Sequence, residues 1–498
     1  MASESVTMDE EAGVPGLARE ALLRRQCLVG GEWIDADDGA AVAIRSPADG
    51  RLIAHVPVCG AAETRCAIEA AALALPAWRD AGAQHRAQAL RRWFDLCMAA
   101  QEDLARILTL EQGKPLAEAR GEIAYGASFL EWFAEEARRV YGDVIPSPDP
   151  SRRIVVIKQP VGVVGAITPW NFPNAMITRK VGAALAAGCT IVVKPAPATP
   201  LSALALGLLA GEAGIPPGVL NIVTGDAAAI GGELTGNATV RKISFTGSTA
   251  VGRLLMRQSA DTVKRVSMEL GGNAPFIVFD DADLDAAIAG VMASKFRNAG
   301  QTCVCANRIF VQAGIYDAFA GKLATAVSAL RVGNGLEPGV TIGPLINQAA
   351  LDKVEAHVSD AAARGARVLT GGKRHALGGF FYEPTILADV DPASRLMSEE
   401  TFGPVAPLIR FTDEAEVIAA ANATESGLAA YLYTRDLGRS WRVSEALEFG
   451  IVGLNEGVIS TAVAPFGGVK QSGVGREGSK YGVEDYVETK YLCIGGLN

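Results

Sequence analysis

Strand-like and helix-like segments alternate regularly between residues 161 and 270, and this alternation constrains the fold more than any other feature of the sequence. The predicted strands are 163–168, 190–194, 219–224, 243–245 and 266–270, and the predicted helices are 174–187, 202–213, 227–235 and 249–259. Repeats of this length are typical of a parallel, doubly wound α/β sheet, which binds ligands at the carboxyl ends of its strands. Residues 275–460 repeat the pattern more loosely and predict a second α/β domain.

The segments outside this region predict smaller units. Residues 28–58 favour short strands or hairpins, and residues 62–140 are helical in pattern with a break at Gly113-Lys114-Pro115. Three prolines interrupt residues 142–150, and the strand-like segment 154–157 that follows has no helix of its own. We expect this strand to project as an arm and to pair with the strand-like end of the chain, 483–494.

The bulk properties exclude several classes of protein. A chain of 498 residues is too long for one ordinary core, so two or three domains are expected. Its 46 basic and 55 acidic residues form no basic patch of the kind that nucleic acid needs. No apolar run has transmembrane length. Residues 1–20 carry five acidic residues and one arginine, which suits no targeting signal, so we expect a short disordered lead-in to a cytoplasmic protein.

The cysteines and histidines limit the chemistry. Eight scattered cysteines do not form a disulfide framework, and Cys303-x-Cys305 lacks the second pair that a zinc site would need. We therefore expect no metal. With four dispersed histidines a Cys–His dyad is hard to build, so a nucleophilic cysteine would need activation by backbone dipoles, a carboxylate or a cofactor charge.

A cysteine and a glutamate stand in settings that favour catalysis. Cys303 follows Gly300 in a polar, turn-forming stretch, and Glu269 precedes two glycines. Glycines allow close backbone approach, so the thiol and the carboxylate could face one cleft as nucleophile and base. The alternative is a buried, inert cysteine and a solvated surface glutamate.

The dinucleotide fingerprint G-x-G-x-x-G is absent. A glycine-flanked turn, Thr246 to Gly252, nevertheless joins a predicted strand to a helix, and a helix N-terminus can receive phosphate. Lys194 ends another predicted strand, where cofactors bind in open sheets. Glycine turns before helices are common, and the alternative for Lys194 is a surface position.

Six motifs in a fixed order carry a family resemblance. They are Thr168-Pro169-Trp170-Asn171-Phe172-Pro173, Val193-Lys194-Pro195, Phe245-Thr246-Gly247-Ser248-Thr249, Glu269-Leu270-Gly271-Gly272, Gly300-Gln301-Thr302-Cys303 and Glu400-Thr401-Phe402-Gly403-Pro404. The chain resembles the NAD(P)-dependent aldehyde dehydrogenase superfamily from about residue 28 to residue 496. The stretches 176–180, 296–305 and 475–482 look most like the succinate-semialdehyde dehydrogenase subgroup.

The resemblance implies an α/β fold of the aldehyde dehydrogenase type. A Rossmann-type NAD(P)-binding domain would comprise residues 1–140 and 161–270, and an α/β catalytic domain would comprise 271–470. A small β oligomerisation arm and C-terminal tail would comprise 141–160 and 471–498. The family also implies a homodimer or homotetramer, and the sequence does not choose between them.

The resemblance also assigns catalytic roles. Cys303 would attack the aldehyde carbon, and the Asn171 amide with the Cys303 backbone N–H would hold the oxyanion. After hydride transfer to the nicotinamide, Glu269 would activate the water that hydrolyses the thioester. Lys180 and Glu477 match positions that relay protons in the family, although either could be a plain ion pair.

NADP or NAD is the cofactor that the resemblance implies. Many NAD-preferring relatives read Lys-Pro-x-Glu, whereas the fourth position here is Pro197, so no carboxylate opposes a 2′-phosphate. We expect NADP to be accepted or even preferred, with Lys194 and Thr199 as candidates to receive that phosphate. The implied cofactor-binding residues are Thr168, Trp170, Lys194, Thr199, Gly247, Ser248, Gly252, Glu400 and Phe402.

Two arginines and a serine point to a small-molecule semialdehyde substrate that carries a carboxylate. Arg179, Arg297 and Ser460 match substrate positions of the subgroup, and arginine can hold a carboxylate bidentately. The alternative is that each arginine bridges a local acid. Succinate semialdehyde is the first expectation, with glutarate semialdehyde or a broader aldehyde range as alternatives, since one methylene changes discrimination by only ~1–3 kcal/mol.

Three further alternatives remain open. Cys305 could be a redox partner of Cys303 or an inert thiol. The chain could keep this fold without catalysis, although Cys303, Glu269, Asn171 and Lys194 are all present. An acylating enzyme that passes the acyl group to coenzyme A is disfavoured because Glu269 is retained as a base for hydrolysis.

Overall fold

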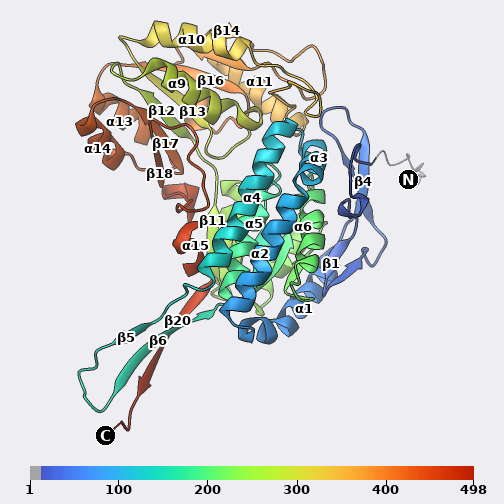
Figure 1. Ribbon diagram of the computed structural model, residues 1–498. Coiled ribbons are helices and arrows are strands. Elements are labelled where there is room, and N and C mark those ends of the chain that lie inside the picture. Colours follow the sequence, from blue (N-terminus) through green and yellow to red (C-terminus); the bar gives the residue numbers. More distant parts are fainter. Residues whose placement is uncertain (1–12, 498) are drawn as a thin grey trace.

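The predicted strand–helix alternation builds an eight-stranded sheet in the lower body of the molecule (Figure 1). The computed structural model describes residues 13–497. The sheet order is β19-β11-β10-β7-β8-β9-β1-β2, and β11, β10, β7, β8 and β9 are parallel. The strands are β1 Cys27–Val29, β2 Glu32–Ile34, β7 Val163–Ile167, β8 Thr190–Lys194, β9 Leu220–Ile222, β10 Val240–Thr246, β11 Arg265–Glu269 and β19 Gly473–Val474. The five predicted strands of this region are therefore confirmed, with 219–224 shortened.

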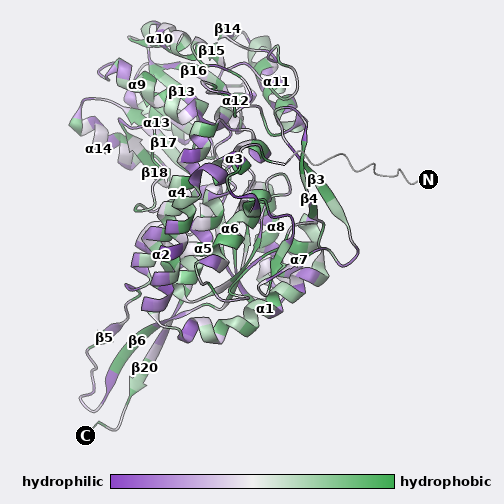
Figure 2. Ribbon diagram, turned by 45° about the vertical axis from the view of Figure 1, so that its right-hand side comes forward, coloured by the Kyte–Doolittle hydropathy of each residue, from purple (hydrophilic) through white to green (hydrophobic). Residues whose placement is uncertain are grey.

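Helices cover both faces of this sheet because its central strands are apolar on both sides. Val164 and Val193 pack in the core beneath α2 to α6, whereas Val163 and Val192 pack in the core beneath α1, α7 and α8. In Figure 2, α2 is largely hydrophilic where it faces the viewer. The helices are α1 Ala61–Asp80, α2 Ala83–Ala99, α3 Gln101–Gln112, α4 Leu116–Glu136, α5 Ala175–Ala187, α6 Leu201–Glu212, α7 Ala227–Gly236 and α8 Thr249–Ala260.

The predicted break between α3 and α4 is present. Gly113 adopts a left-handed φ of 96° at the end of α3, and α4 begins after Pro115. A glycine at this position ends a helix at little conformational cost, and proline suits the start of the next.

A seven-stranded sheet forms the upper body, in the order β14-β15-β16-β13-β12-β17-β18. Its strands are β12 Ala274–Val278, β13 Ala306–Gln312, β14 Arg367–Thr370, β15 Thr385–Ala388, β16 Val405–Phe411, β17 Ala429–Tyr433 and β18 Ile451–Leu454. Its helices are α9 Leu284–Val291, α10 Tyr316–Ser328, α11 Gln348–Ala363, α12 Arg395–Ser398, α13 Glu414–Asn422 and α14 Leu437–Ala446. The helix predicted over 282–296 ends at Val291 and continues as a π-helical turn, Met292–Phe296.

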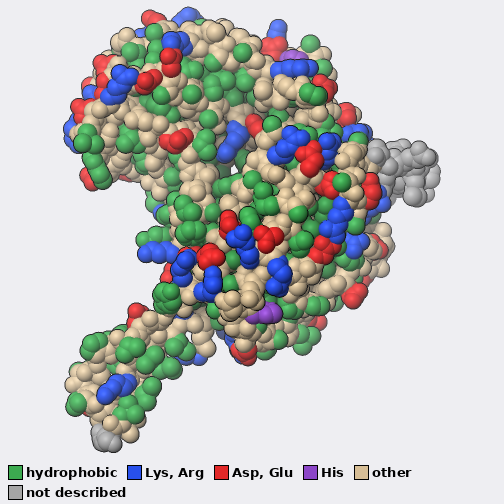
Figure 3. All heavy atoms as spheres, in the orientation of Figure 1, with side chains coloured by type: hydrophobic (Ala, Val, Ile, Leu, Met, Phe, Trp, Pro, Cys, Tyr) green, Lys and Arg blue, Asp and Glu red, His purple; other side chains and the backbone are tan. Residues whose placement is uncertain are grey.

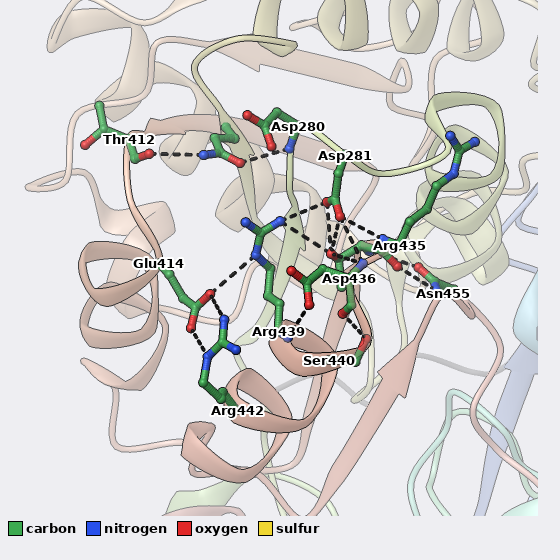
Figure 4. A network of polar contacts seen from close by, with 12 residues as sticks. Asp280, Asp281, Thr412, Glu414, Arg435, Asp436, Arg439, Ser440, Arg442 and Asn455 are labelled. Carbon is green, nitrogen blue, oxygen red and sulfur yellow. Dashed lines mark hydrogen bonds and ion pairs between the residues drawn. The ribbon is translucent and has the colours of Figure 1, made fainter.

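A polar network ties α14 to the loop after β12 (Figure 4). Asp281 accepts hydrogen bonds from the Thr434 hydroxyl and from the Arg439 guanidinium, at 2.9 Å each. Arg439 also pairs with Glu414 at the start of α13. This network lies outside the site described below.

The predicted arm projects from the lower body (Figure 1). It consists of β5 Asp143–Ile145, β6 Arg153–Pro160 and β20 Val487–Ile494, and β20 pairs antiparallel with β6 along its whole length. The predicted pairing of 154–157 with the chain end is confirmed. The predicted strand 483–494 is wrong at its start, because Ser479–Glu484 forms the short helix α15 that packs Val483 into the lower core.

The remaining segments are short. The hairpin β3 Ala41–Arg45 and β4 Leu52–Pro57 confirms the strands predicted over 28–58, and 3₁₀ turns occupy Glu20–Leu22, Arg297–Gly300 and Lys470–Ser472. Residues 1–12 of the predicted disordered lead-in lie outside the described residues. The prediction is wrong for its end, since the Ala18 and Arg19 backbone N–H groups bind the Asp103 carboxylate. Within residues 13–497, no helix combines the length and apolar character needed to cross a membrane.

Candidate functional site

Cys303 lies at the end of a tightly held loop, as its sequence setting predicted. Asn298, Ala299 and Gly300 adopt left-handed φ values of 52°, 53° and 74° in succession. A Cβ on Gly300 would lie 2.1 Å from the Gly403 carbonyl oxygen, so only glycine fits this turn. The Tyr431 hydroxyl donates to the Val304 carbonyl at 2.7 Å and holds the chain just after the thiol.

The thiol lies where two cavities meet. We call the larger one, of about 350 Å³, the large cleft; its lining includes Trp170, Asn171, Gly247, Ser248, Cys303, Lys353, Glu400 and Phe402. On the other side is the inner pocket, of about 10 Å³, which is lined by Arg179, Arg297, Thr302, Cys303, Ser460 and Phe466, among others. The inner pocket shares Tyr125, Phe172, Arg297 and Ser460 with an outer pocket of about 290 Å³. A molecule in the large cleft and a second one arriving through the outer pocket could thus both reach Cys303.

Glu269 ends strand β11 and is almost fully buried, with 3% of its surface exposed. Burial, together with the nearby Glu477 carboxylate, raises the pKa of Glu269 well above its ordinary value, whereas Arg179 and Lys180 oppose this rise. Its Oε2 atom has no hydrogen-bond partner among the described residues. An unpartnered buried carboxyl oxygen is free to bind a water molecule or a reacting group.

Glycines after Glu269 bring this segment against the cysteine loop. A Cβ on Gly272 would lie 2.4 Å from the Cys303 carbonyl oxygen, so this close approach requires glycine. The sequence prediction that the thiol and the carboxylate share one site agrees with this geometry.

Asn171 lies beside Cys303 in the lining of the large cleft. Its side-chain amide donates one hydrogen bond to the Gln301 carbonyl at 3.0 Å, which fixes the orientation of the amide. Its backbone carbonyl accepts from Lys114 Nζ at 2.8 Å and from Asn298 Nδ2 at 3.0 Å. The amide can therefore present its other N–H to an oxygen atom bound near the thiol.

The two predicted substrate arginines differ in their partners. Arg179 is 1% exposed and pairs with Glu477 at 2.8 Å, which is the alternative interpretation of this residue. Lys180 binds the same carboxylate and also donates to the Ser244 hydroxyl at 3.1 Å. Arg297 lies 5.3 Å from the Phe172 ring centre and forms no ion pair with any residue that the structure describes.

Five predicted cofactor residues lie together in the large cleft: Trp170, Gly247, Ser248, Glu400 and Phe402. The Trp170 and Phe402 rings meet edge to face with their centres 5.5 Å apart. Glu400 accepts from the Gly272 backbone N–H at 3.1 Å, and burial raises the pKa of Glu400 to about 7. Ser248 caps α8, so the start of that helix faces the cleft.

The other four predicted cofactor residues do not line the large cleft. Thr199 is fully buried and its hydroxyl donates to the Trp170 carbonyl, so it holds the loop instead of offering a free donor. Gly252 packs against Leu270, where a Cβ would lie 2.4 Å from a methyl carbon. Lys194 is buried rather than on the surface; it donates to the Pro195 carbonyl at 3.1 Å, and burial lowers its pKa to about 8. Thr168 is buried, and its hydroxyl finds no hydrogen-bond partner within residues 13–497.

Cys305 is buried, and Cys303 and Cys305 are both free thiols. The Cys305 thiol donates to the Lys295 carbonyl at 3.4 Å, and burial raises its pKa. Its role as a redox partner stays a prediction. In the described part of the chain, no three His, Cys, Asp or Glu side chains gather closely enough to hold a metal ion.

Sequence reasoning missed several residues of the site. Lys353 reaches the large cleft from α11, and Glu118, Glu122 and Tyr125 reach the outer pocket from α4. Lys114 was noted only as part of a helix break, yet its ammonium group binds the Asn171 carbonyl. A buried lysine and two glutamates four residues apart gave no local signal, since the same pattern is common on exposed helices.

Comparison with known proteins agrees with these features. The model described as "Aldehyde dehydrogenase family" matches residues 33–492. The NADP(+) succinate-semialdehyde dehydrogenase GabD of Escherichia coli is 65% identical over 474 residues, which cover 95% of this chain and 98% of that protein. A glutarate-semialdehyde dehydrogenase of Pseudomonas aeruginosa is 64% identical over 476 residues, covering 96% and 99%. The crystal structure of succinate-semialdehyde dehydrogenase from Burkholderia pseudomallei is 64% identical, with a TM-score of 0.96 and coverage of 96% and 100%.

Proposed function

Because the chain belongs to the aldehyde dehydrogenase family, we propose that it oxidises succinate semialdehyde to succinate with NADP⁺ or NAD⁺. The observation that carries the substrate is Arg297, which forms no ion pair in the described structure, although its charge acts on the Glu118 carboxylate, and which shares a pocket with Cys303 and Ser460. A carboxylate on the substrate would supply the missing partner. Glutarate semialdehyde is the second candidate, since a relative of 64% identity carries that name.

Cys303 is the proposed nucleophile. Its thiolate adds to the aldehyde carbon and forms a thiohemiacetal whose oxyanion accepts hydrogen bonds from the Asn171 amide and the Cys303 backbone N–H. The fixed orientation of Asn171 supports this role, because an oxyanion donor must be in place before charge develops. Loss of one such donor typically lowers the rate on the order of 10²–10³-fold.

Glu269 is the proposed base for the second half of the reaction. Once hydride has left, Cys303 carries a thioester, and the Glu269 carboxylate takes a proton from the water that attacks it. The thiolate then leaves and the acid is released. The buried, unpartnered Oε2 of Glu269 supports this assignment, and hydrolysis is favoured over transfer to coenzyme A for the same reason.

Lys180 and Glu477 are proposed to relay the proton away from Glu269. The buried contacts among Glu477, Lys180 and Ser244 support a route that leads from the site into the lower body. Arg179 stabilises the negative charge of Glu477, and it also lines the inner pocket, so a contribution to carboxylate binding is compatible with its ion pair.

The large cleft fits a nicotinamide dinucleotide. Trp170 and Phe402 offer apolar contacts, Glu400 offers a carboxylate for hydroxyl groups, and the start of α8 at Ser248 offers N–H groups for phosphate. When bound there, NAD(P)⁺ supplies the acceptor for the hydride. The domain formed by residues 1–140 and 161–270 is the proposed binding domain for this cofactor.

NADP⁺ is proposed to be an accepted cofactor. Pro197 and Ala198 are exposed next to Lys194, so position 197 places no carboxylate against a 2′-phosphate, although the Asp226 carboxylate acts on the charge of Lys194. Lys194 is the remaining candidate to bind the phosphate, because the Thr199 hydroxyl already donates to Trp170.

Formation of reduced nicotinamide by the purified enzyme tests this function. Succinate semialdehyde, glutarate semialdehyde and propanal are each supplied with NAD⁺ and with NADP⁺, for the wild type and for Arg297→Ala. Arg297→Lys is the matched control, since it keeps the charge and loses the planar fork. We expect the wild type to prefer the semialdehydes, and Arg297→Ala to lose this preference through a raised KM.

Two outcomes would contradict the proposal. Equal turnover of propanal and the semialdehydes by the wild type would remove the substrate assignment while leaving the family membership intact. Strong selectivity for NAD⁺ would contradict the cofactor assignment.

A further inference from the structure

Three charged residues at the start of α4 bind the backbone of both chain segments that form the site. We call Lys114, Glu118 and Glu122 the α4 clamp. Glu118 and Glu122 lie four residues apart on α4 and share one face of it, whereas Lys114 stands just before the helix begins. None of them is a nucleophile, base or cofactor ligand in the mechanism above.

Lys114 and Glu122 hold the segment that carries Asn171. They form an ion pair in which each side chain is only 1% exposed. Lys114 Nζ donates to the Asn171 carbonyl at 2.8 Å and lies 3.9 Å from the centre of the Phe172 ring. Glu122 accepts from the backbone N–H groups of Asn174 and Ala175, at 3.0 and 3.2 Å.

Glu122 therefore caps the start of α5 from another helix. The first N–H groups of a helix lack partners within it, and a carboxylate at this end is favourable both as an acceptor and as a charge. Because α5 also carries Arg179 and Lys180, its placement affects the ion pairs with Glu477 as well as Asn171.

Glu118 holds the second segment. Its carboxylate accepts from the Asn298 backbone N–H at 2.8 Å, directly after Arg297. Asn298 is the first of the three left-handed residues before the cysteine, and its side chain donates back to the Asn171 carbonyl. The clamp thus joins the oxyanion side of the site to the cysteine loop.

We propose that the α4 clamp consists of positioning residues, which set the Asn171 amide and the 297–303 loop at the separation that oxyanion binding requires. The amide must lie within hydrogen-bond distance of an oxygen attached to the carbon that Cys303 attacks. A shift of about 1 Å in such a group can lower a rate by about 10²-fold. This inference rests on the proposed role of Asn171, but not on the identity of the semialdehyde.

The test compares clamp variants with matched controls elsewhere in the lower body. Lys114→Met, Glu118→Gln and Glu122→Gln remove the three charges. Glu111→Gln is the control for Glu122, since Glu111 is equally buried and caps α6 through the N–H groups of Leu201 and Ser202. Lys264→Met is the control for Lys114, because Lys264 donates to two backbone carbonyls outside the site.

Four quantities are measured for each variant: kcat with propanal, kcat with succinate semialdehyde, KM for the cofactor, and the rate of Cys303 alkylation by iodoacetamide. We expect Lys114→Met and Glu122→Gln to lower kcat for both aldehydes by up to about 10²-fold. Cofactor KM and alkylation should not change, because alkylation is a displacement that develops no oxyanion. Glu118→Gln should lower kcat/KM more for succinate semialdehyde than for propanal, because Glu118 binds Asn298, the residue directly after Arg297.

The controls should lose thermal stability but keep kcat. The proposal is overturned if the clamp variants lose no more kcat than the controls, or if alkylation of Lys114→Met or Glu122→Gln falls in parallel with kcat. Failure of the substrate assignment would appear separately, as a wild type that shows no preference for the semialdehyde, and the propanal measurements would still decide the role of the clamp.

Discussion

The Cys303 thiol is not activated by the protein alone. Burial raises the pKa of Cys303 to about 12, and the positive charge of Arg179 only partly opposes this rise. An ordinary cysteine has a pKa of ~8.5, so the buried thiol holds even less thiolate at neutral pH. The positive charge of a nicotinamide in the large cleft is the addition that would lower the pKa, since Cys303 lines that cleft. We therefore expect the thiol to become reactive when the cofactor is bound.

The glutamate behaves differently, and its pH dependence can be predicted. Because burial raises the pKa of Glu269 well above its ordinary value, the carboxyl becomes protonated as the pH falls through that raised pKa. A protonated carboxyl cannot take a proton from water, so kcat of the wild type should fall on the acidic side, at a pH well above the range in which an ordinary glutamate titrates. Steady-state kcat measured across pH checks this expectation.

Glu269→Gln separates the two halves of the reaction. We expect kcat to fall by about 10²–10⁴-fold, the usual contribution of a general base. The decrease of kcat at acidic pH should also disappear, because the variant has no carboxyl at this position to protonate. A rapid burst of reduced nicotinamide should remain, because hydride transfer precedes hydrolysis. Mass spectrometry should then find the acyl group on Cys303. Loss of the burst together with steady-state turnover would contradict a role confined to hydrolysis.

The residues of the site were predictable only where family motifs carry them. Cys303, Glu269 and Asn171 stand in such motifs, and the structure brings all three to one place. The partner of Arg179 could not be predicted, since Glu477 lies almost three hundred residues further along the chain. The burial of Thr199 could not be predicted either. It follows two exposed residues, Pro197 and Ala198, in a loop that has no periodic pattern to mark a buried position. Contacts between distant segments depend on packing, which no local pattern specifies.

At the scale of elements, the sequence predicted more than it did for the site. Strand β8 was predicted with its observed bounds, because an apolar run between turn signals reads as a buried strand. The end of the chain was harder: 483–494 reads as one strand, yet α15 includes its beginning because Val483 packs into the lower core. The π-helical turn after α9 also gave no sequence signal, since helix periodicity continues through it.

The crossing of α4 and α5 depends on a glycine. A Cβ on Gly126 would lie 2.4 Å from Asn174 Oδ1 and 3.2 Å from the Ala175 Cα atom, at the start of α5. We expect Gly126→Ala to push α5 away from α4 and to lower stability by about 1–3 kcal/mol, the usual cost of overpacking. Since Asn171 immediately precedes this turn, kcat should fall as well.

Gly121→Ala is the matched control on the same helix. Gly121 is exposed and a Cβ there meets no atom within 4 Å, so alanine should raise helix stability by about 0.5–1 kcal/mol. Thermal midpoints and kcat of the two variants check the comparison. Equal thermal midpoints and equal kcat for the two variants would mean that Gly126 does not set the distance between α4 and α5.

At the scale of the whole molecule, the site lies between the two sheets. Glu269 ends a strand of the lower sheet, whereas Cys303 and Glu400 come from loops of the upper one. The length of the chain predicted more than one domain, and two large cores are present, one in each body. The position of one body against the other was not predictable from periodicity, because periodicity describes single elements.

The arm carries the last prediction. Hydrophobic side chains gather on its face in Figure 3, and Val144 and Tyr491 are 79% and 59% exposed. Exposed apolar surface on a projecting sheet is typical of a protein interface, so we expect a second copy of the chain to cover it. The wild type should therefore be a dimer or a tetramer in light scattering. Val144→Asp combined with Tyr491→Asp should lower its mass, because a carboxylate buried at an interface is costly.

Leu437→Asp is the control for this experiment. Leu437 is 74% exposed at the start of α14, on the upper body and away from the arm, so its substitution should leave the mass unchanged. A wild type that is monomeric at working concentration, or an arm variant with the same mass as the wild type, would contradict an interface at the arm. If the arm variant dissociates but keeps kcat, the site is complete within one chain.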